Sequence, residues 1–186
     1  MIAAYHSKSW TSKAIRFFTW SDISHVALVD PYDAVYQSLT DDGVCKVGSA
    51  DLITNLSRHH TEGTLVDIYE IRIPDSQYPD GKRITAEQWD LIHAFCESQL
   101  GKHYDWRGVF SFITRRNIKN RIKDFLRMRV KDRWPQKWFC SDFVFVALGV
   151  GHITMLNLPY YKVSPAQLVS SPLCHKVRTI RTIKDV

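Results

Sequence analysis

The chain has 186 residues, of which 45% are hydrophobic and 12% aromatic, and its formal net charge is +6. This length and composition indicate one globular domain and exclude a disordered or low-complexity chain. No stretch approaches the roughly 18 consecutive apolar residues that a membrane-spanning helix needs, and the N-terminus does not resemble a secretory signal. We therefore expect a soluble protein, cytoplasmic by default, with export by another route left open.

In chain order, the first half of the sequence predicts a helix at 11–20, strands at 24–30, 33–39 and 44–47, a short helix at 49–56 capped by Ser49, and a strand at 64–73. The strand predictions depend on alternating apolar residues and on their Val, Ile and Leu content. Pro31 and Pro74 follow two of these strands directly and end them.

The second half predicts a helix at 85–101, with a capping box from Thr85 and Gln88, then helices at 104–113, 140–151 and 164–172 and a strand at 176–183. No strand–helix–strand unit repeats. The predicted fold class is therefore α+β, an antiparallel sheet or open barrel packed by helices, in a single domain over 1–186.

One segment carries the positive charge. Residues 114–134 contain nine Lys or Arg and two Asp, a local net charge of +7, so the rest of the chain is close to neutral. The apolar residues of the segment recur at near-helical spacing, which predicts an amphipathic helical insertion. It either meets an anionic surface, such as lipid head groups or a cell-wall polymer, or is a solvated helix packed on the domain. The side chains considered for that contact are Arg115, Arg116, Lys119, Arg121, Lys123 and Arg127.

Four cysteines are present, and their wide spacing, without a CxxC pair, argues against a structural zinc site or a redox pair. Only Cys140 begins a predicted helix. Free backbone N–H groups and the helix dipole favour an anion there, which lowers the pKa of a thiol, and the same groups can hold an oxyanion. Cys96 lies on the apolar face of the helix 85–101 and is interpreted as core. Cys140 is therefore the candidate nucleophile.

A cysteine nucleophile needs a histidine base and commonly a third polar group that orients the imidazole. His25 lies on the apolar strand 24–30, where a histidine is unusual unless it has partners. Gln37, on the next strand, offers an amide oxygen that can accept from the imidazole N–H. The alternative interpretation is a buried cysteine and a core histidine that is satisfied by the backbone.

Five short stretches follow one another in a distinctive order: KAIRFFTWSDISHVALVD, VYQSLTDDGV, KHYDWRGVFSF, WFCSDFVFVAL and VSPAQLVSSP. Together, over about residues 12–172, they resemble the permuted papain-like amidases, the YiiX/YebB-like branch of the NlpC-type cysteine hydrolases. In that family the catalytic His precedes the Cys. Its two motifs are matched here by SHVALV (24–29) and CSDFV (140–144). Asp142 replaces a commoner Glu, and Gln37 stands where many members have an acid.

The resemblance implies a cysteine hydrolase in which Cys140 attacks a carbonyl, His25 transfers the proton and Gln37 holds the His25 ring. The backbone N–H of Cys140 is then expected in the oxyanion hole. Three residues that flank this set are candidate substrate contacts, namely Ser24, Trp138 and Phe139. For the two aromatic residues, the alternative is that they only seat the helix.

Three functions remain open. The favoured one is an amidase or peptidase on a peptide-like amide, with cell-wall peptides as one substrate class. The second is a thiol acyltransferase or lipase on lipid esters, and the third is a non-catalytic module that binds through its basic face. We predict no metal and no cofactor, because His59, His60 and Glu62 lack zinc-ligand spacing and no nucleotide or nucleic-acid motif is present.

Overall fold

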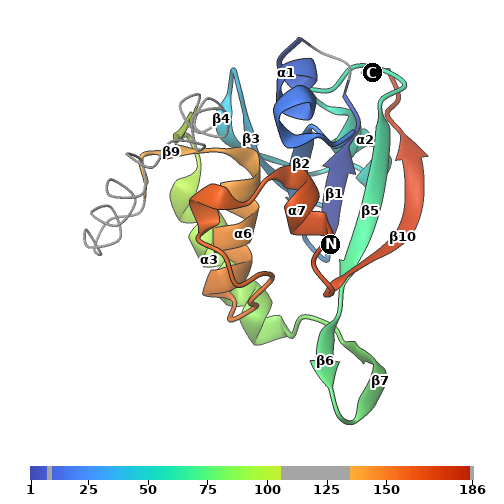
Figure 1. Cartoon of the computed structure of the whole chain (residues 1–186), viewed down its shortest axis with the longest axis vertical. Helices are drawn as coiled ribbons and strands as arrows, with labels where there is room; N and C mark the ends of the chain where they lie inside the picture. Colours follow the sequence, from blue (N-terminus) through green and yellow to red (C-terminus); the bar gives the residue numbers. More distant parts are fainter. Residues whose placement is uncertain (8–9, 106–134, 185–186) are drawn as a thin grey trace.

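The computed structural model describes residues 1–7, 10–105 and 135–184. Its main feature is a six-stranded antiparallel sheet in the order β10-β5-β1-β2-β3-β4 (Figure 1). The strands are β1 (Ile2–Tyr5), β2 (His25–Val29), β3 (Val35–Leu39), β4 (Gly43–Val47), β5 (Leu65–Ile71) and β10 (Cys174–Arg181). Two short pairings lie outside this sheet. They are the hairpin β6 (Ile73–Asp75) with β7 (Tyr78–Lys82), and the parallel pair β8 (His103–Tyr104) with β9 (Lys137–Trp138).

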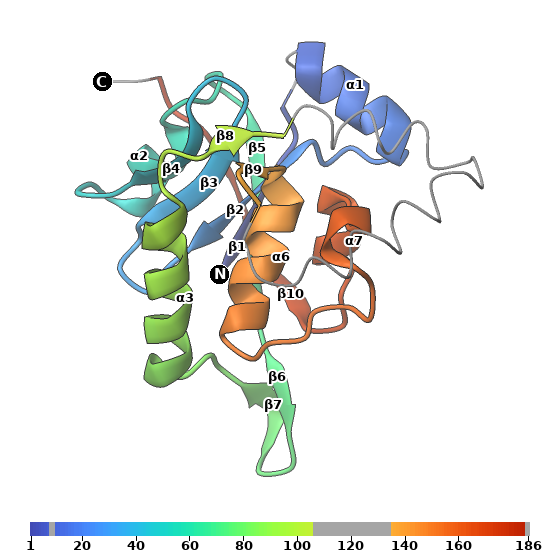
Figure 2. The ribbon, with the colours of Figure 1, turned by 90° about the vertical axis from the view of Figure 1, so that its left-hand side faces the viewer.

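Helices cover both faces of the sheet. On one face lie α3 (Ala86–Gln99), α6 (Cys140–Val150) and α7 (Pro165–Val169), as Figure 2 shows. The short helix α2 (Leu52–Ser57) packs on the other face. Helix α1 (Trp10–Thr19) lies at one end of the molecule, and the 3-10 turn η1 (Tyr160–Lys162) precedes α7. No helix among the described residues is both long and apolar enough to cross a membrane.

Strand alternation divides the core into two parts. On β2, Val26 and Leu28 face the cluster that contains α6, whereas Ala27 and Val29 face the cluster that contains α2. All four are fully buried, because successive side chains of a strand point to opposite faces and both faces are covered here.

The α+β prediction is confirmed, and the helix 85–101 is observed as α3 with its predicted capping box. The Gln88 N–H donates to the Thr85 hydroxyl oxygen over 3.3 Å, and the Thr85 N–H donates to Gln88 Oε1 over 3.0 Å. The predicted Ser49 cap of the next helix is wrong. Asp51 caps α2 instead, because its carboxylate accepts from the backbone N–H groups of Ile53 and Thr54.

Strand β1 is not among the elements predicted above, although it lies inside the sheet between β5 and β2. Its four residues are all buried, so they show no alternation from which a strand can be predicted. The predicted helix 104–113 begins differently, since Tyr104 belongs to β8, and its residues from 106 onward lie outside the described residues. The basic segment 114–134, with Arg115, Arg116, Lys119, Arg121, Lys123 and Arg127, also lies outside them.

Candidate functional site

Strands β2 and β3 part at one end of the sheet. Their ladder covers only Leu28 with Tyr36 and Val29 with Val35. The same register continued would place Val26 opposite Ser38. Because the Val29 N–H donates to β1, alternation turns the N–H of Val26 toward the β3 side. The parted strands therefore leave this N–H without its ladder partner.

The Cys140 thiol lies near that N–H group. The Val26 N–H, together with the N–H groups of Cys140 and Ser141 at the start of α6, acts to lower the pKa of the thiol. The Cys140 side chain belongs to the core cluster on the α6 side of the sheet.

Side-chain hydrogen bonds hold the chain before Cys140 in this position. The Ser38 hydroxyl donates to the Trp138 carbonyl over 2.8 Å, which fastens β9 to the end of β3. The Trp138 indole N–H donates to Gln99 Oε1 over 3.1 Å and ties the same turn to α3. The Ser141 hydroxyl donates to the Val163 carbonyl. The first turn of α6 is thus anchored from three directions.

The electrostatic environment keeps Cys140 protonated. The pKa of the Cys140 thiol is raised to about 12. Complete burial is the largest cause, the nearby N–H groups lower the pKa, and the charge of Asp142 raises it. The expectation of a lowered pKa, which rested on the helix N-terminus alone, is therefore wrong. Desolvation outweighs the N–H groups here because the side chain is 0% exposed.

His25 and Gln37 are brought together as predicted. His25 Nε2 lies 3.1 Å from Gln37 Oε1, and the Gln37 side chain is fully buried. An amide oxygen only accepts, so the Nε2 atom carries the proton and the Nδ1 atom keeps a lone pair. Burial lowers the pKa of His25 to about 4, and the Gln37 hydrogen bond raises it by less. The imidazole is neutral at pH 7.

A second histidine, from the polar loop after α2, shares this oxygen. His60 Nε2 also lies 3.1 Å from Gln37 Oε1, and its ring stacks on Tyr5 with centroids 4.0 Å apart. Burial lowers the pKa of His60 to about 2, with further contributions from the neighbouring His25 and His59. The Gln37 amide nitrogen is buried without a hydrogen-bond partner in the described chain. In the sequence, the polar doublet His59-His60 was the only signal for the contact between His60 and Gln37.

Cys140 and His25 approach the same part of β2, but within the described residues their side chains do not form a hydrogen bond with each other. The thiol lies near the N–H of Val26, the residue after His25. The His25 ring contacts Tyr5 and His60, with centroid distances of 5.3 and 5.4 Å, on the α2 side of the sheet. The His25 ring thus lies on the α2 side of the sheet and the Cys140 thiol on the α6 side, both near the same end of β2.

A cavity of about 220 Å³ opens beside His25. Its walls come from α1, from the ends of β2 and β3, from the loop after α2 and from β8; they include Ser12, Ile15, Ser24, His25, Ser38, His60 and Tyr104. Tyr104 also packs against Phe139, the residue before Cys140, with ring centroids 5.9 Å apart. Burial is the main cause that raises the pKa of Tyr104 well above the ordinary value. Tyr104 therefore connects the cavity wall with the start of α6.

The three candidate substrate contacts differ in their positions. Ser24 lines the cavity, and its hydroxyl donates to the Tyr5 carbonyl over 3.1 Å while it accepts from the Ser7 N–H. Trp138 and Phe139 are each 1% exposed, belong to the α6 core and do not line this cavity. In this structure they seat the start of α6.

In the described part of the chain, no group of three or more His, Cys, Asp or Glu side chains is placed to hold a metal ion. Of the histidine doublet, His59 Nδ1 lies 3.1 Å from Asp42 Oδ2 on the exposed side of the loop. Glu62 is exposed.

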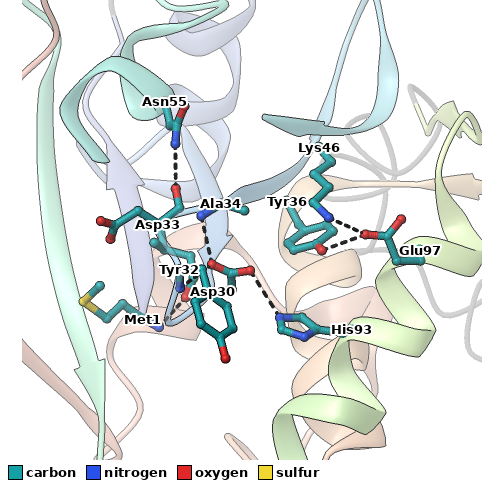
Figure 3. A network of polar contacts seen from close by, with 11 residues as sticks. Met1, Asp30, Tyr32, Asp33, Ala34, Tyr36, Lys46, Asn55, His93 and Glu97 are labelled. Atoms are coloured by element: carbon teal, nitrogen blue, oxygen red, sulfur yellow. Dashed lines mark hydrogen bonds and ion pairs between the residues drawn. The ribbon is translucent and has the colours of Figure 1, made fainter. Parts of the chain in front are cut away.

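A larger cavity, of about 520 Å³, lies near the opposite end of β2. Figure 3 shows its polar wall, where Asp30 Oδ1 accepts from the N–H groups of Tyr32 and Ala34, each over 2.8 Å. The other carboxylate oxygen lies 3.3 Å from His93 Nε2. Asp30 here closes the turn between β2 and β3 and ties it to α3. Among the described residues, no cysteine lines either cavity, but the 220 Å³ cavity is lined by His25 and His60, so the site at the open end of β2 remains the stronger candidate.

No protein-family model matches the sequence, and the curated proteins contain no significant match. Among solved structures, the chain is similar to yiiX from Escherichia coli O157:H7, which is described as a metalloprotein. The two share 20% sequence identity, the TM-score is 0.57, and the match covers 95% of this chain and 94% of the other. This likeness shows a shared α+β fold over nearly the whole chain.

Proposed function

We propose that the protein is a cysteine hydrolase of the permuted papain-like kind that cleaves a peptide-like amide. Cys140 is the nucleophile, His25 the base and Gln37 the residue that orients the base. The observation that carries the proposal is the 3.1 Å contact between His25 Nε2 and Gln37 Oε1. This contact leaves Nδ1 as the basic atom of the ring. His25 directly precedes Val26, whose N–H lies near the Cys140 thiol.

The steps follow from these roles. The Cys140 thiol gives its proton to His25 Nδ1 while the sulfur attacks the carbonyl carbon. N–H groups at the start of α6 stabilise the oxyanion. The C–N bond then breaks, the amine leaves with the proton from His25, and a thioester remains on Cys140. Water then attacks the thioester carbonyl while it gives a proton to His25. His25 returns this proton to the Cys140 sulfur as the C–S bond breaks, which restores the thiol and releases the acid.

The proposed resting state is a neutral thiol beside a neutral imidazole. A pKa of about 12 for Cys140 and of about 4 for His25 both oppose a preformed ion pair. An amide at position 37 is consistent with this, since it stabilises an imidazolium less than a carboxylate does. Proton transfer therefore accompanies the attack.

The fold likeness to yiiX supports this architecture at the level of the backbone. That protein is described as a metalloprotein, whereas the reaction proposed here needs only Cys140, His25 and Gln37. We expect a chelator to leave the activity unchanged.

Trapping of the acyl-enzyme tests the proposal. The full chain is incubated with peptidoglycan fragments, with activated peptide esters and with lipid esters, and its mass is measured after rapid acid quenching. We expect an adduct from a peptide donor, located on Cys140 by peptide mapping. It is lost in Cys140→Ala and kept in the control Cys174→Ser, because Cys174 is a half-buried thiol on the distant strand β10.

Each other outcome has a defined meaning. An adduct from lipid esters alone makes the protein a thiol acyltransferase or lipase. Turnover that persists in Cys140→Ala contradicts both enzymatic assignments. Full biological activity of Cys140→Ala with no adduct from any donor favours the non-catalytic module, in which the basic segment 114–134 binds an anionic surface such as a cell-wall polymer.

A further inference from the structure

We propose that the outer face of α1, with the residue that follows this helix, docks on the interface of a phospholipid bilayer that contains anionic lipid. This surface, termed the α1 patch, consists of Lys13, Arg16 and Phe17 of α1 and the following Trp20. The proposal does not depend on the chemistry assigned to Cys140, so either can fail without the other.

The aromatic side chains of the α1 patch face solvent. Trp20 is 91% exposed and Phe17 is 70% exposed, and their rings stack on each other with centroids 6.4 Å apart. By contrast, Trp89 and Trp138 are 9% and 1% exposed. Figure 1 shows α1 at an outer end of the molecule, away from α3 and α6. Two adjacent, exposed aromatic residues mark a surface that is used in an intermolecular contact.

The backbone of Trp20 supports the same conclusion independently. Helix α1 ends at Thr19, and Trp20 follows it at φ 52°, in the left-handed region. This position after a helix normally holds Gly or Asn, because a bulky side chain is strained there. The other described non-glycine residues with positive φ are Asp33, Ser49, His59 and His152, all of them polar. An exposed tryptophan at a strained position indicates an external role.

The charges of the α1 patch favour a lipid surface as the occupant. The helix sequence WTSKAIRFFT contains Lys13 and Arg16 and no acidic residue. A shallow hollow of about 500 Å³ is lined by Lys13, Arg16, Phe17 and Trp20 with Ser21 and Asp22. Within it the Arg16 guanidinium lies 2.9 Å from Asp22 Oδ1. Cations beside amphipathic aromatic rings suit the head-group region of a bilayer, where phosphates meet the acyl boundary.

The opposite side of α1 faces the candidate site. Ser12 and Ile15 are 7% exposed and line the 220 Å³ cavity beside His25. One short helix thus carries the α1 patch outside and a wall of the cavity inside. Docking of α1 brings the cavity to the lipid surface.

Vesicle co-sedimentation of the full chain tests the proposal. Vesicles of phosphatidylcholine with phosphatidylglycerol are compared with vesicles of phosphatidylcholine alone, for the wild type, Phe17→Ala, Trp20→Ala and the double variant. We expect wild-type binding to the anionic vesicles and a loss of about tenfold or more in affinity for the double variant. The control is Tyr32→Ala, because Tyr32 is 84% exposed in the turn at the other end of β2. All variants keep residues 106–134, so any binding by those residues is common to the series.

Trp20→Gly separates docking from folding. Glycine suits the positive φ, so this variant should melt at or above the wild-type temperature and still lose vesicle binding. Wild-type protein that fails to sediment with anionic vesicles overturns the proposal, as does a double variant that binds like the wild type. Concentration-dependent self-association that Trp20→Gly abolishes, without vesicle binding, assigns the α1 patch to a second copy instead and equally overturns it.

Discussion

The imidazole of His25 donates through Nε2 to the side-chain oxygen of Gln37, over a distance of 3.1 Å. The two residues start from neighbouring strands, and continuation of the β2–β3 register sets Gln37 opposite Ala27, so the contact runs diagonally across the parted strands. His60 donates to the same oxygen from the loop after α2. One buried amide therefore positions two neutral imidazoles at the edge of the cavity.

Replacement of Gln37 tests its orienting role. Gln37→Leu removes the acceptor for His25 at similar size, so we expect kcat/KM to fall roughly 100-fold, the loss that a small misplacement of a catalytic group can cause. Gln37→Glu places a carboxylate at the same point and should raise the pKa of His25 from about 4 toward neutrality. The acid limb of the pH–rate profile then moves upward. An unchanged profile in both variants contradicts the assignment of Gln37.

The two half-buried histidines, His25 and His60, predict acid sensitivity of the fold. Both have a folded pKa below the unfolded value of 6.5, about 4 for His25 and about 2 for His60. The unfolded chain therefore binds more protons below pH 6.5, and stability falls as the pH drops from 6.5 toward 4. The slope is at most about 1.4 kcal/mol per pH unit for each group. Urea unfolding at pH 7, 6 and 5 measures it.

His60→Phe is the matched variant for this measurement. It keeps a ring to stack on Tyr5 and removes one titrating group, so the slope below pH 6.5 should fall by about half. The exposed His175 serves as a control, since His175→Phe should leave the slope as in the wild type. Equal slopes in all three proteins would show that His60 is protonated as readily in the folded chain as in the unfolded one.

Thiol reactivity should report the closed state of the site. The sulfur of Cys140 is wholly buried and protonated, so iodoacetamide at pH 7.5 should label the half-buried Cys45 and Cys174 before Cys140. Tyr104→Ala removes a ring that packs on Phe139, the residue before Cys140, and we expect Cys140 to react about tenfold faster or more. Peptide mapping gives the rate for each cysteine. Tyr69→Ala, on β5, is the control that should leave the Cys140 rate unchanged.

The Ser38 hydroxyl should contribute both to stability and to the site. Ser38→Ala removes one of two donors to the Trp138 carbonyl, which keeps the Asp105 N–H at 3.0 Å, so the free energy of unfolding should fall by about 0.5–1.5 kcal/mol. The turn before Cys140 loses its link to β3, and kcat/KM should fall with it. Ser170→Ala removes an exposed hydroxyl bond at the end of α7 and should cost less than about 0.5 kcal/mol. Similar losses in both variants would argue against a special role for Ser38.

Elements with a local signal were predicted from the sequence. The capping box of Thr85 with Gln88 locates the start of α3, since both partners lie within one helical turn. Strand β1 and the Asp51 cap were not predicted. β1 is defined by its neighbours β5 and β2 on either side, and the Ser49–Asp51 choice depends on backbone angles that the residue types alone do not determine.

For the site, the sequence by itself determined which residue types could serve as nucleophile, base and orienting group, namely Cys140, His25 and Gln37. The tertiary structure decided how they relate. It paired His25 with Gln37, added His60 to the same oxygen, and brought the Cys140 thiol near the Val26 N–H where β2 leaves β3. It also reversed the expected acidity of the thiol. Helix position is local and can be predicted from the sequence, whereas desolvation depends on every segment that surrounds the sulfur and exists only in the folded chain.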